Sequence, residues 1–270
     1  MKPILKYPGA KWRLSEWITR NMPPHESYLE PFFGSGAVLF NKPKSRIETV
    51  SDLDGDIVHF FKVCRERADE LAFALSLTPW SREEYMAADN RSDLDDLERA
   101  RRFCVRCWMS IGGKRLKSGW RCTTGKQKDG GPDNAKLWGR LPEIVHQVAG
   151  RLIGVQIENR PAVDVIQTYQ GEEVLVYADP PYLKETRTAH GDMYLHEMTD
   201  EEHVGLLRCL REHPGPAMIS GYDCELYNDM LAGWHKVTTD TQAERGARRT
   251  EVLWMNKKPL QHDSGQLKLW

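Results

Sequence analysis

The sequence predicts an α/β protein with a doubly wound, mostly parallel sheet and a helical insertion. The first observation is a short apolar run, residues 174–178, that leads into Asp179-Pro-Pro-Tyr182. Such runs are typical of buried parallel strands, and the two prolines end the strand because neither can donate to a sheet ladder. The second observation is that strand-like and helix-like segments alternate before and after residues 81–150, which are helical and basic instead. We therefore expect one α/β domain from residues 1–80 and 151–270, with a helical insertion at 81–150.

The chain opens with a turn-rich segment, residues 5–11, in which Pro8-Gly9 breaks regular structure. A short amphipathic helix is expected over residues 12–22. Residues 28–40 then predict a strand, a glycine turn and a helix, in which Gly34 and Gly36 let the backbone approach a ligand closely. A dinucleotide-binding fingerprint needs a third glycine, and Leu39 stands at that position.

A second strand, residues 47–54, ends in acidic residues. An acid after the second strand is suited to binding the hydroxyl groups of a ribose, and Asp52 is assigned to the ligand for this reason. Asp54 is expected to cap the helix that begins near Gly55. Apolar residues at helical spacing continue this helix, or two helices in series, to about residue 77.

The second half of the chain returns to α/β alternation. Residues 155–166 predict a strand and a short helix, and the polar segment 183–193 is suited to a loop that closes over a site. Thr199-Asp-Glu-Glu202 has the pattern of a capping box that opens a helix. The remaining expectations are a strand at 216–220, a helix at 224–231, and an antiparallel pair at 234–241 and 250–256.

The insertion carries a concentrated positive charge. Nine Lys and Arg residues lie between Arg101 and Lys128 without an Asp or Glu among them. Trp108, Trp120 and several glycines are interleaved, a combination typical of nucleic-acid surfaces. Two helical pieces, 93–109 and 135–149, are expected around this basic loop.

Composition places the chain among soluble globular proteins, with 29% charged residues and a net charge of −1. No apolar stretch has the length of a secretory signal or a membrane span, and we expect a cytoplasmic protein. Its six cysteines then remain reduced. Cys104 and Cys107 form a CxxC, but no second pair completes a zinc site, and no metal is expected.

The Asp179–Tyr182 corner offers two hydrogen-bond acceptors and one stacking surface, with no nucleophile and no general acid. Asp179 and the Pro180 carbonyl are suited to accept the two hydrogens of an amino group, while Tyr182 stacks on the ring that bears it. Together with the glycine turn and Asp52, this corner indicates a nucleoside-type cofactor beside an amino-bearing ring. The missing third glycine favours S-adenosyl-L-methionine over a dinucleotide.

These segments resemble the Dam-like DNA adenine methyltransferases, in which the cofactor motif precedes the recognition region and the catalytic motif follows it. The similar segments are Tyr7-Pro-Gly-Ala-Lys11, Glu30-Pro-Phe-Phe-Gly-Ser-Gly36, Asp52, Glu158-Asn-Arg160 and Asp179-Pro-Pro-Tyr182. The resemblance implies methyl transfer from S-adenosyl-L-methionine to the amino group of an adenine flipped out of duplex DNA. It implies that residues 1–80 and 151–270 form the catalytic, cofactor-binding domain and that residues 81–150 form the DNA-binding, target-recognition insertion. It also implies catalytic roles for Asp179, Pro180 and Tyr182. The implied cofactor contacts are Tyr7, Lys11, Phe33, Gly34, Gly36, Asp52, Asn159, Arg160 and Asp179.

Double-stranded DNA is the expected partner, and a monomer associated with the nucleoid is the expected state. The candidate DNA-binding residues are Lys114, Arg115, Lys117, Arg121, Lys126, Arg245 and Arg248. They could contact guanine edges or phosphates, so the target sequence stays open. An RNA adenine methyltransferase and a non-catalytic DNA-binding protein are the alternatives. An NAD-dependent oxidoreductase is disfavoured, because it would need the third glycine and a proton-transfer residue.

Overall fold

The computed structural model describes residues 1–88, 94–113, 118–122, 133–187, 194–242 and 248–259. Its sheet has the order β3-β2-β1-β4-β5-β7-β6, with β7 antiparallel to both of its neighbours and the pairs from β3 to β5 parallel. The strands are β1 Ser27–Glu30, β2 Ile47–Ser51, β3 Val155–Glu158, β4 Val174–Ala178, β5 Ala217–Tyr222, β6 His235–Gln242 and β7 Arg248–Met255. The predicted doubly wound, mostly parallel sheet is confirmed.

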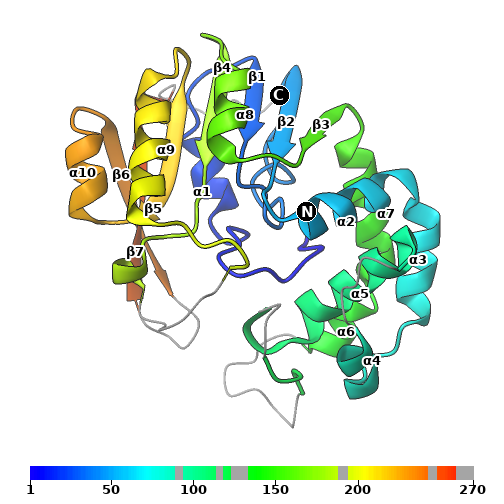
Figure 1. Ribbon diagram of the computed structural model, residues 1–270. Coiled ribbons are helices and arrows are strands. Elements are labelled where there is room, and N and C mark those ends of the chain that lie inside the picture. Colours follow the sequence, from blue (N-terminus) through cyan, green and yellow to red (C-terminus); the bar gives the residue numbers. More distant parts are fainter. Residues whose placement is uncertain (89–93, 114–117, 123–132, 188–193, 243–247, 260–270) are drawn as a thin grey trace, which may run out of the picture.

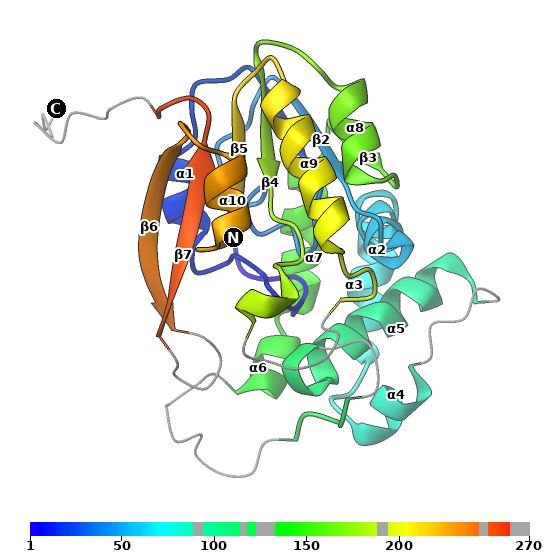
Figure 2. The ribbon, with the colours of Figure 1, turned by 60° about the vertical axis from the view of Figure 1, so that its left-hand side comes forward.

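Helices cover both faces of this sheet (Figures 1 and 2). The α-helices are α1 Ser15–Arg20, α2 Gly55–Glu66, α3 Ala68–Leu77, α4 Arg82–Ala87, α5 Asp96–Met109, α6 Asn134–Trp138, α7 Leu141–Leu152, α8 Ala162–Thr168, α9 Asp200–Glu212 and α10 Glu225–Met230. Short 3₁₀ turns lie at Ile111–Gly113 and Lys184–Thr186. No helix among the described residues is long and apolar enough to cross a membrane.

Strand alternation divides the core into two clusters. Tyr28, Leu175 and Met218 pack with α1, α2, α3, α5 and α7 on one face. The next residue of each strand, such as Leu29 or Val176, packs with α8, α9 and α10 on the other face. Successive strand side chains point to opposite faces, so a strand buried on both sides is mostly apolar, as β4 is.

The helices of residues 81–150 share the first cluster with the sheet. Phe103 on α5 and Val145 on α7 are fully buried in it with Phe60 of α2. The ring nitrogen of Trp108 on α5 donates to the Ile4 carbonyl at 2.8 Å, which fastens the entry segment to this helix. In Figure 1, α4, α5 and α6 lie beside α3 and α7, far from α9 and α10.

Several local predictions are confirmed. Asp54 caps α2 by accepting from the Asp56 amide, and Thr199 and Glu202 form the capping box of α9. The pair β6 and β7 is antiparallel as expected.

Two helix predictions are wrong. The segment after the glycine turn forms consecutive turns, with the amide of Phe40 bonded to the Gly36 carbonyl. A helix cannot extend here because Pro43 has no N–H and the Asn41 side chain binds the Ala37 carbonyl. The piece predicted over 135–149 is divided into α6 and α7, because Gly139 ends the first helix and Pro142 opens the second.

Candidate active site

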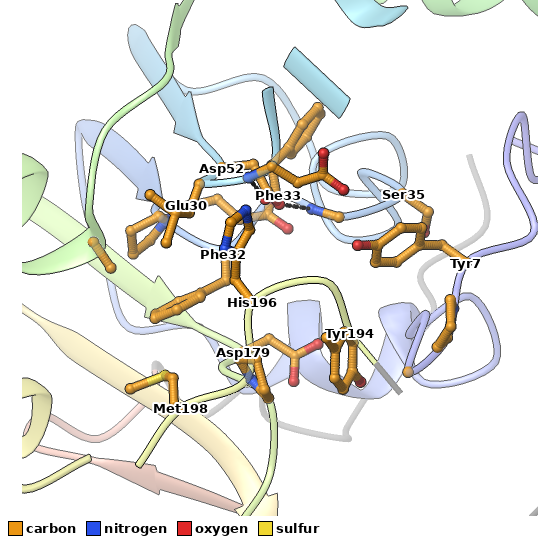
Figure 3. Close-up of a pocket in the computed structure, with 18 of the residues that line it drawn as sticks. Tyr7, Glu30, Phe32, Phe33, Ser35, Asp52, Asp179, Tyr194, His196 and Met198 are labelled. Carbon is orange, nitrogen blue, oxygen red and sulfur yellow. Dashed lines mark hydrogen bonds between the residues drawn. The ribbon is translucent and has the colours of Figure 1, made fainter. Parts of the chain in front are cut away.

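A cavity of about 280 Å³ lies where β1, β2 and β4 end. The strand order changes direction at β1, because β2 lies on one side of it and β4 on the other. Ligands of open α/β sheets bind at such a switch point. Figure 3 shows side chains from the entry segment, the strand ends and residues 194–198 around this space.

The glycine turn and Asp52 form one wall of the cavity. The Gly34 amide donates to Asp52 Oδ2 at 2.7 Å and the Asp54 amide donates to Oδ1 at 2.9 Å. Gly34 and Gly36 have positive φ, +50° and +69°, and a Cβ on Gly36 would come within 2.3 Å of the Phe40 ring. The turn therefore requires glycine. A carboxylate has more acceptor positions than two amides use, so Asp52 can also accept from hydroxyl groups.

Asp179 lies at the opposite wall, directly after β4. Its Oδ1 is 3.0 Å from Lys11 Nζ and accepts from Ser220 Oγ at 2.7 Å. Lys11 is buried; burial alone would lower the pKa of its ammonium, but the charges of Asp179 and Glu251 raise it overall. Lys11 is thus a permanent cation at this end of the cavity, bonded also to the Gly9 carbonyl.

Only two of the four residues of the Asp-Pro-Pro-Tyr corner line the cavity. Asp179 and Pro181 line the cavity, whereas Pro180 and Tyr182 do not. The Tyr182 hydroxyl donates to Glu251 Oε2 at 2.7 Å, and Lys11 Nζ lies 4.5 Å from the centre of the Tyr182 ring. The Lys11 ammonium therefore contacts both Asp179, in the cavity wall, and the Tyr182 ring.

The expected cofactor residues fall into two sets. Those that line the cavity are Tyr7, Lys11, Phe33, Gly34, Asp52 and Asp179. Asn159, Arg160 and Gly36 do not line it. Asn159 instead donates to the Asp52 carbonyl at 2.7 Å, and the Arg160 carbonyl accepts from Ser51 at 3.1 Å. These two residues hold the ends of β2 and β3 together, while Pro161, Ala162 and Val163 reach the cavity.

Most of the candidate DNA-binding residues, namely Lys114, Arg115, Lys117, Lys126 and Arg245, lie outside the described residues. Arg121 is described, and its Nε donates to the Ser110 carbonyl at 3.0 Å. The backbone of Arg248 begins β7, opposite Gln242.

Sequence reasoning missed several cavity residues. Glu30, at the end of β1, is buried and accepts from the Tyr28 hydroxyl at 2.9 Å. Burial raises the pKa of Glu30 to about 8, although the bond from Tyr28 opposes this shift. The sequence signal for Glu30 was its position at the end of a predicted strand, two residues before Phe32 and Phe33.

Tyr194, His196, Glu197 and Met198 also line the cavity and follow the polar segment that was expected to close over a site. A Cβ on Gly9 would lie 2.1 Å from the Tyr194 hydroxyl, so Gly9 permits this close approach. Arg187 forms a buried ion pair with Glu197 at 2.7 Å, which ties residues 194–198 to the end of the 3₁₀ turn that follows Tyr182.

The donor set fits a nucleoside with a charged tail better than a metal. Within the described ranges, no three His, Cys, Asp or Glu side chains are grouped to hold a metal ion. Cys104 and Cys107 are buried in α5, and burial raises the pKa of the Cys104 thiol well above its usual value. The cavity instead offers an acid for hydroxyls at Asp52, an aromatic wall at Phe33, and the paired charges of Lys11 and Asp179.

Comparison with known proteins gives one family match and several similar proteins. The model of the D12 class N6 adenine-specific DNA methyltransferases matches residues 7–243. A Type II methyltransferase, M.MjaIII of Methanocaldococcus jannaschii, is 24% identical over 87% of this chain and 89% of that protein. A DNA adenine methylase of Salmonella typhi is 31% identical over 34% of this chain and 31% of that protein. A putative RNA methyltransferase from Pyrococcus horikoshii, of known structure, superposes with a TM-score of 0.39 at 6% identity, over 92% of this chain and 81% of that one.

Proposed function

The chain belongs to the D12 class N6 adenine-specific DNA methyltransferase family, and from this premise we propose that it transfers the methyl group of S-adenosyl-L-methionine to a flipped-out adenine in duplex DNA. It is an enzyme, an adenine-specific DNA methyltransferase, by its family and its relatives. The observation that carries the detailed proposal is the place of Asp179, which lines the cavity and pairs with the same Lys11 ammonium that lies over the Tyr182 ring.

The cavity would hold the methyl donor by its two polar ends. Asp52 would accept the ribose hydroxyls, and Phe33 would pack against the nucleoside. Lys11 and Tyr7 would contact the amino-acid end, near Asp179. When bound, the donor supplies a methyl group made electrophilic by its attachment to a positively charged sulfur.

Asp179 and the Pro180 carbonyl would act on the amino group of the base. The lone pair of this nitrogen is delocalised into the adenine ring, which makes it a weak nucleophile. Two hydrogen bonds from its protons to these acceptors favour a tetrahedral nitrogen with an available lone pair. The nitrogen–carbon bond would form as the sulfur–carbon bond breaks, the demethylated cofactor would leave as a neutral thioether, and the surplus proton of the nitrogen would pass to solvent water. Orientation of the reacting atoms supplies much of the acceleration.

The adenine must leave the duplex stack before it can reach Asp179. Flipping costs a few kcal/mol, and stacking on an aromatic ring offsets part of that cost. Tyr182 would provide this ring. The basic loop of the 81–150 insertion would supply phosphate contacts and base readout, with the protein acting as a monomer.

The decisive experiment measures methyl transfer from labelled S-adenosyl-L-methionine to unmethylated duplex DNA and, in parallel, to RNA. Wild-type protein is compared with Asp179→Ala and with Asp229→Ala, an exposed acid on α10 that does not line the cavity. We expect N6-methyladenine at one short DNA motif with wild type and Asp229→Ala, and none with Asp179→Ala. Label in RNA alone would favour the RNA alternative, and cofactor binding without transfer would favour the non-catalytic alternative.

A further inference from the structure

The orientation of the Tyr182 ring depends on residues outside its own segment. The Pro180-Pro181 backbone fixes where the Tyr182 Cα lies, but the ring plane is set by two side-chain torsions. Two neighbours restrict these torsions. Glu251 accepts the hydroxyl at 2.7 Å, and the Tyr222 ring meets the Tyr182 ring edge-on, with 4.7 Å between centroids and 76° between planes.

Both neighbours come from the β5–β7 ladder. Tyr222 and Glu251 are direct partners in this antiparallel pair, so their side chains lie on the same face, about 5 Å apart at Cβ. Ser220 lies two residues before Tyr222 on β5, hence also on this face, and it donates to Asp179. One face of one ladder thus supports both functional side chains of the Asp-Pro-Pro-Tyr corner.

A carboxylate at position 251 is costly to bury. Glu251 is 6% exposed, and burying an acid requires hydrogen bonds or opposite charge in compensation. The Tyr182 hydroxyl provides a donor, and the charge of Glu251 interacts with the Lys11 ammonium. Burial and the nearby carboxylates raise the pKa of Tyr182 well above its usual value, so its hydroxyl keeps the proton that it donates to Glu251.

We propose that Glu251 is a positioning residue, which holds the Tyr182 ring through its hydroxyl and, together with Tyr222, presents that ring as the stacking surface for the target base. This inference rests on the proposed function, because it concerns the base that the enzyme methylates. It assigns to β7 a role in base capture and leaves cofactor binding to the cavity, which neither Glu251 nor Tyr182 lines.

The test is a pair of near-isosteric variants in two backgrounds. Glu251→Gln keeps an acceptor for the Tyr182 hydroxyl, whereas Glu251→Met removes it; both remove the charge. Each is made in wild-type protein and in Tyr182→Phe, which lacks the hydroxyl. Thr250→Ala is the control, since Thr250 adjoins Glu251 but is exposed and donates to Asp240.

In the wild-type background, kcat/KM for DNA should be about tenfold lower for Glu251→Met than for Glu251→Gln. This is the effect expected when the Tyr182 hydroxyl loses its hydrogen-bond acceptor. In the Tyr182→Phe background this difference should vanish. Cofactor affinity should be equal for Glu251→Gln and Glu251→Met, because both remove the charge that interacts with Lys11. When 2-aminopurine replaces the target adenine, its fluorescence reports how far the base leaves the stack. The fluorescence change on binding should be smaller for Glu251→Met than for Glu251→Gln.

The role of Glu251 would be overturned if kcat/KM for DNA differed between Glu251→Gln and Glu251→Met in the Tyr182→Phe background. It would also be overturned if the two variants had equal kcat/KM in the wild-type background. A cofactor affinity that is lower for Glu251→Met than for Glu251→Gln, in parallel with the activity, would overturn it as well. If Glu251→Met does not fold, Tyr182→Phe alone decides, since it must lower kcat/KM for DNA while Thr250→Ala does not. Absence of methyl transfer by wild-type protein contradicts the proposed function itself, so the two failures are distinguishable.

Discussion

At the scale of single residues, three of the acids that line the cavity have different neighbours. Asp52 accepts two backbone amides, and Asp179 pairs with Lys11. Glu30 is buried beside a neutral phenol. Charges and amides stabilise the ionised form of an acid, while burial favours the protonated form. Burial raises the pKa of Glu30 to about 8, so Glu30 carries a proton near neutral pH.

Glu30 gives the protein a specific pH dependence of stability. Its pKa is about 8 in the folded state, against the ordinary 4.5. Between these values the folded state binds more protons than the unfolded state, so the free energy of unfolding falls as pH rises, by up to about 1.4 kcal/mol per pH unit. Glu30→Gln keeps an acceptor for the Tyr28 hydroxyl but cannot ionise, so the fall in the free energy of unfolding with rising pH is removed. Urea unfolding at pH 5, 6, 7 and 8 should show the variant gaining on wild type across the window; a constant difference would contradict the assignment.

Asp52 can be tested separately from catalysis. Asp52→Asn retains only one acceptor oxygen, so either a backbone amide or the bound ribose loses its partner. Calorimetry should show affinity for S-adenosyl-L-methionine reduced by about 10- to 100-fold, with a smaller effect on kcat at saturation. Asp69→Asn, an almost fully exposed acid on α3, serves as control and should bind as wild type. Equal affinities for both variants would exclude a role for Asp52 in binding.

At the scale of elements, α9 connects the second face of the core to the cavity. Its first turn follows Met198, and Glu202 and Leu206 line the cavity. The capping box joins Thr199 and Glu202 by reciprocal bonds of 2.7 and 3.3 Å. These bonds satisfy amides at the helix start that have no partner within the helix.

Loss of this cap should lower stability more than activity. Thr199→Ala removes one of the two bonds and should cost about 1 kcal/mol, seen as a lower urea midpoint with an unchanged slope. Thr199→Ser keeps the hydroxyl and should match wild type. A Thr199→Ala protein as stable as wild type would show that the cap contributes nothing.

At the scale of the whole molecule, the insertion and the sheet domain share one core. Phe103 of α5 and Val145 of α7 lie in the cluster that covers one face of the sheet. Apolar burial at about 25 cal/mol per Å² makes such shared clusters a principal source of stability. Residues 81–150 and the sheet domain are therefore packed against each other, and residue 150 lies within α7.

Replacement of residues 81–150 by a short linker should therefore prevent cooperative folding. The shortened chain would expose the sides of α2 and α3 that α5 and α7 cover, and we expect a shallow urea transition and no cofactor binding. Circular dichroism and calorimetry provide the measurement. A shortened chain with a sharp transition and normal affinity for the cofactor would show that the two parts are independent.

Binding of DNA should depend on the basic loop through salt. Removing one lysine or arginine that binds a phosphate should reduce the slope of log affinity against log salt by about 0.9. Changing Lys114, Arg115 and Lys117 to Gln should lower the slope by that amount for each residue that binds phosphate, and should relax specificity for each that reads a base. Lys44→Gln, an exposed lysine before β2, is the control. An unchanged slope and specificity would remove the loop from the interface.

Local patterns in the sequence were enough to predict the strands, both helix caps and the edge where the cavity lies. Apolar runs, glycine turns and capping residues act over a few residues, and parallel strands place their carboxyl ends together. The helix after the glycine turn was mispredicted for a local reason as well, because Pro43 and the Asn41 side chain outweigh the apolar pattern.

Contacts between residues far apart in the chain were decided only by the tertiary structure. The pairing of Lys11 with Asp179, of Ser220 with Asp179 and of Tyr182 with Glu251 depends on strand order and register. Asn159 lies beside Asp52 but supports its backbone. Sequence alone determined the fold class, the Asp179–Tyr182 corner and the family resemblance, because each depends on contiguous segments of the chain. The partners of each side chain follow from packing, which no local pattern encodes.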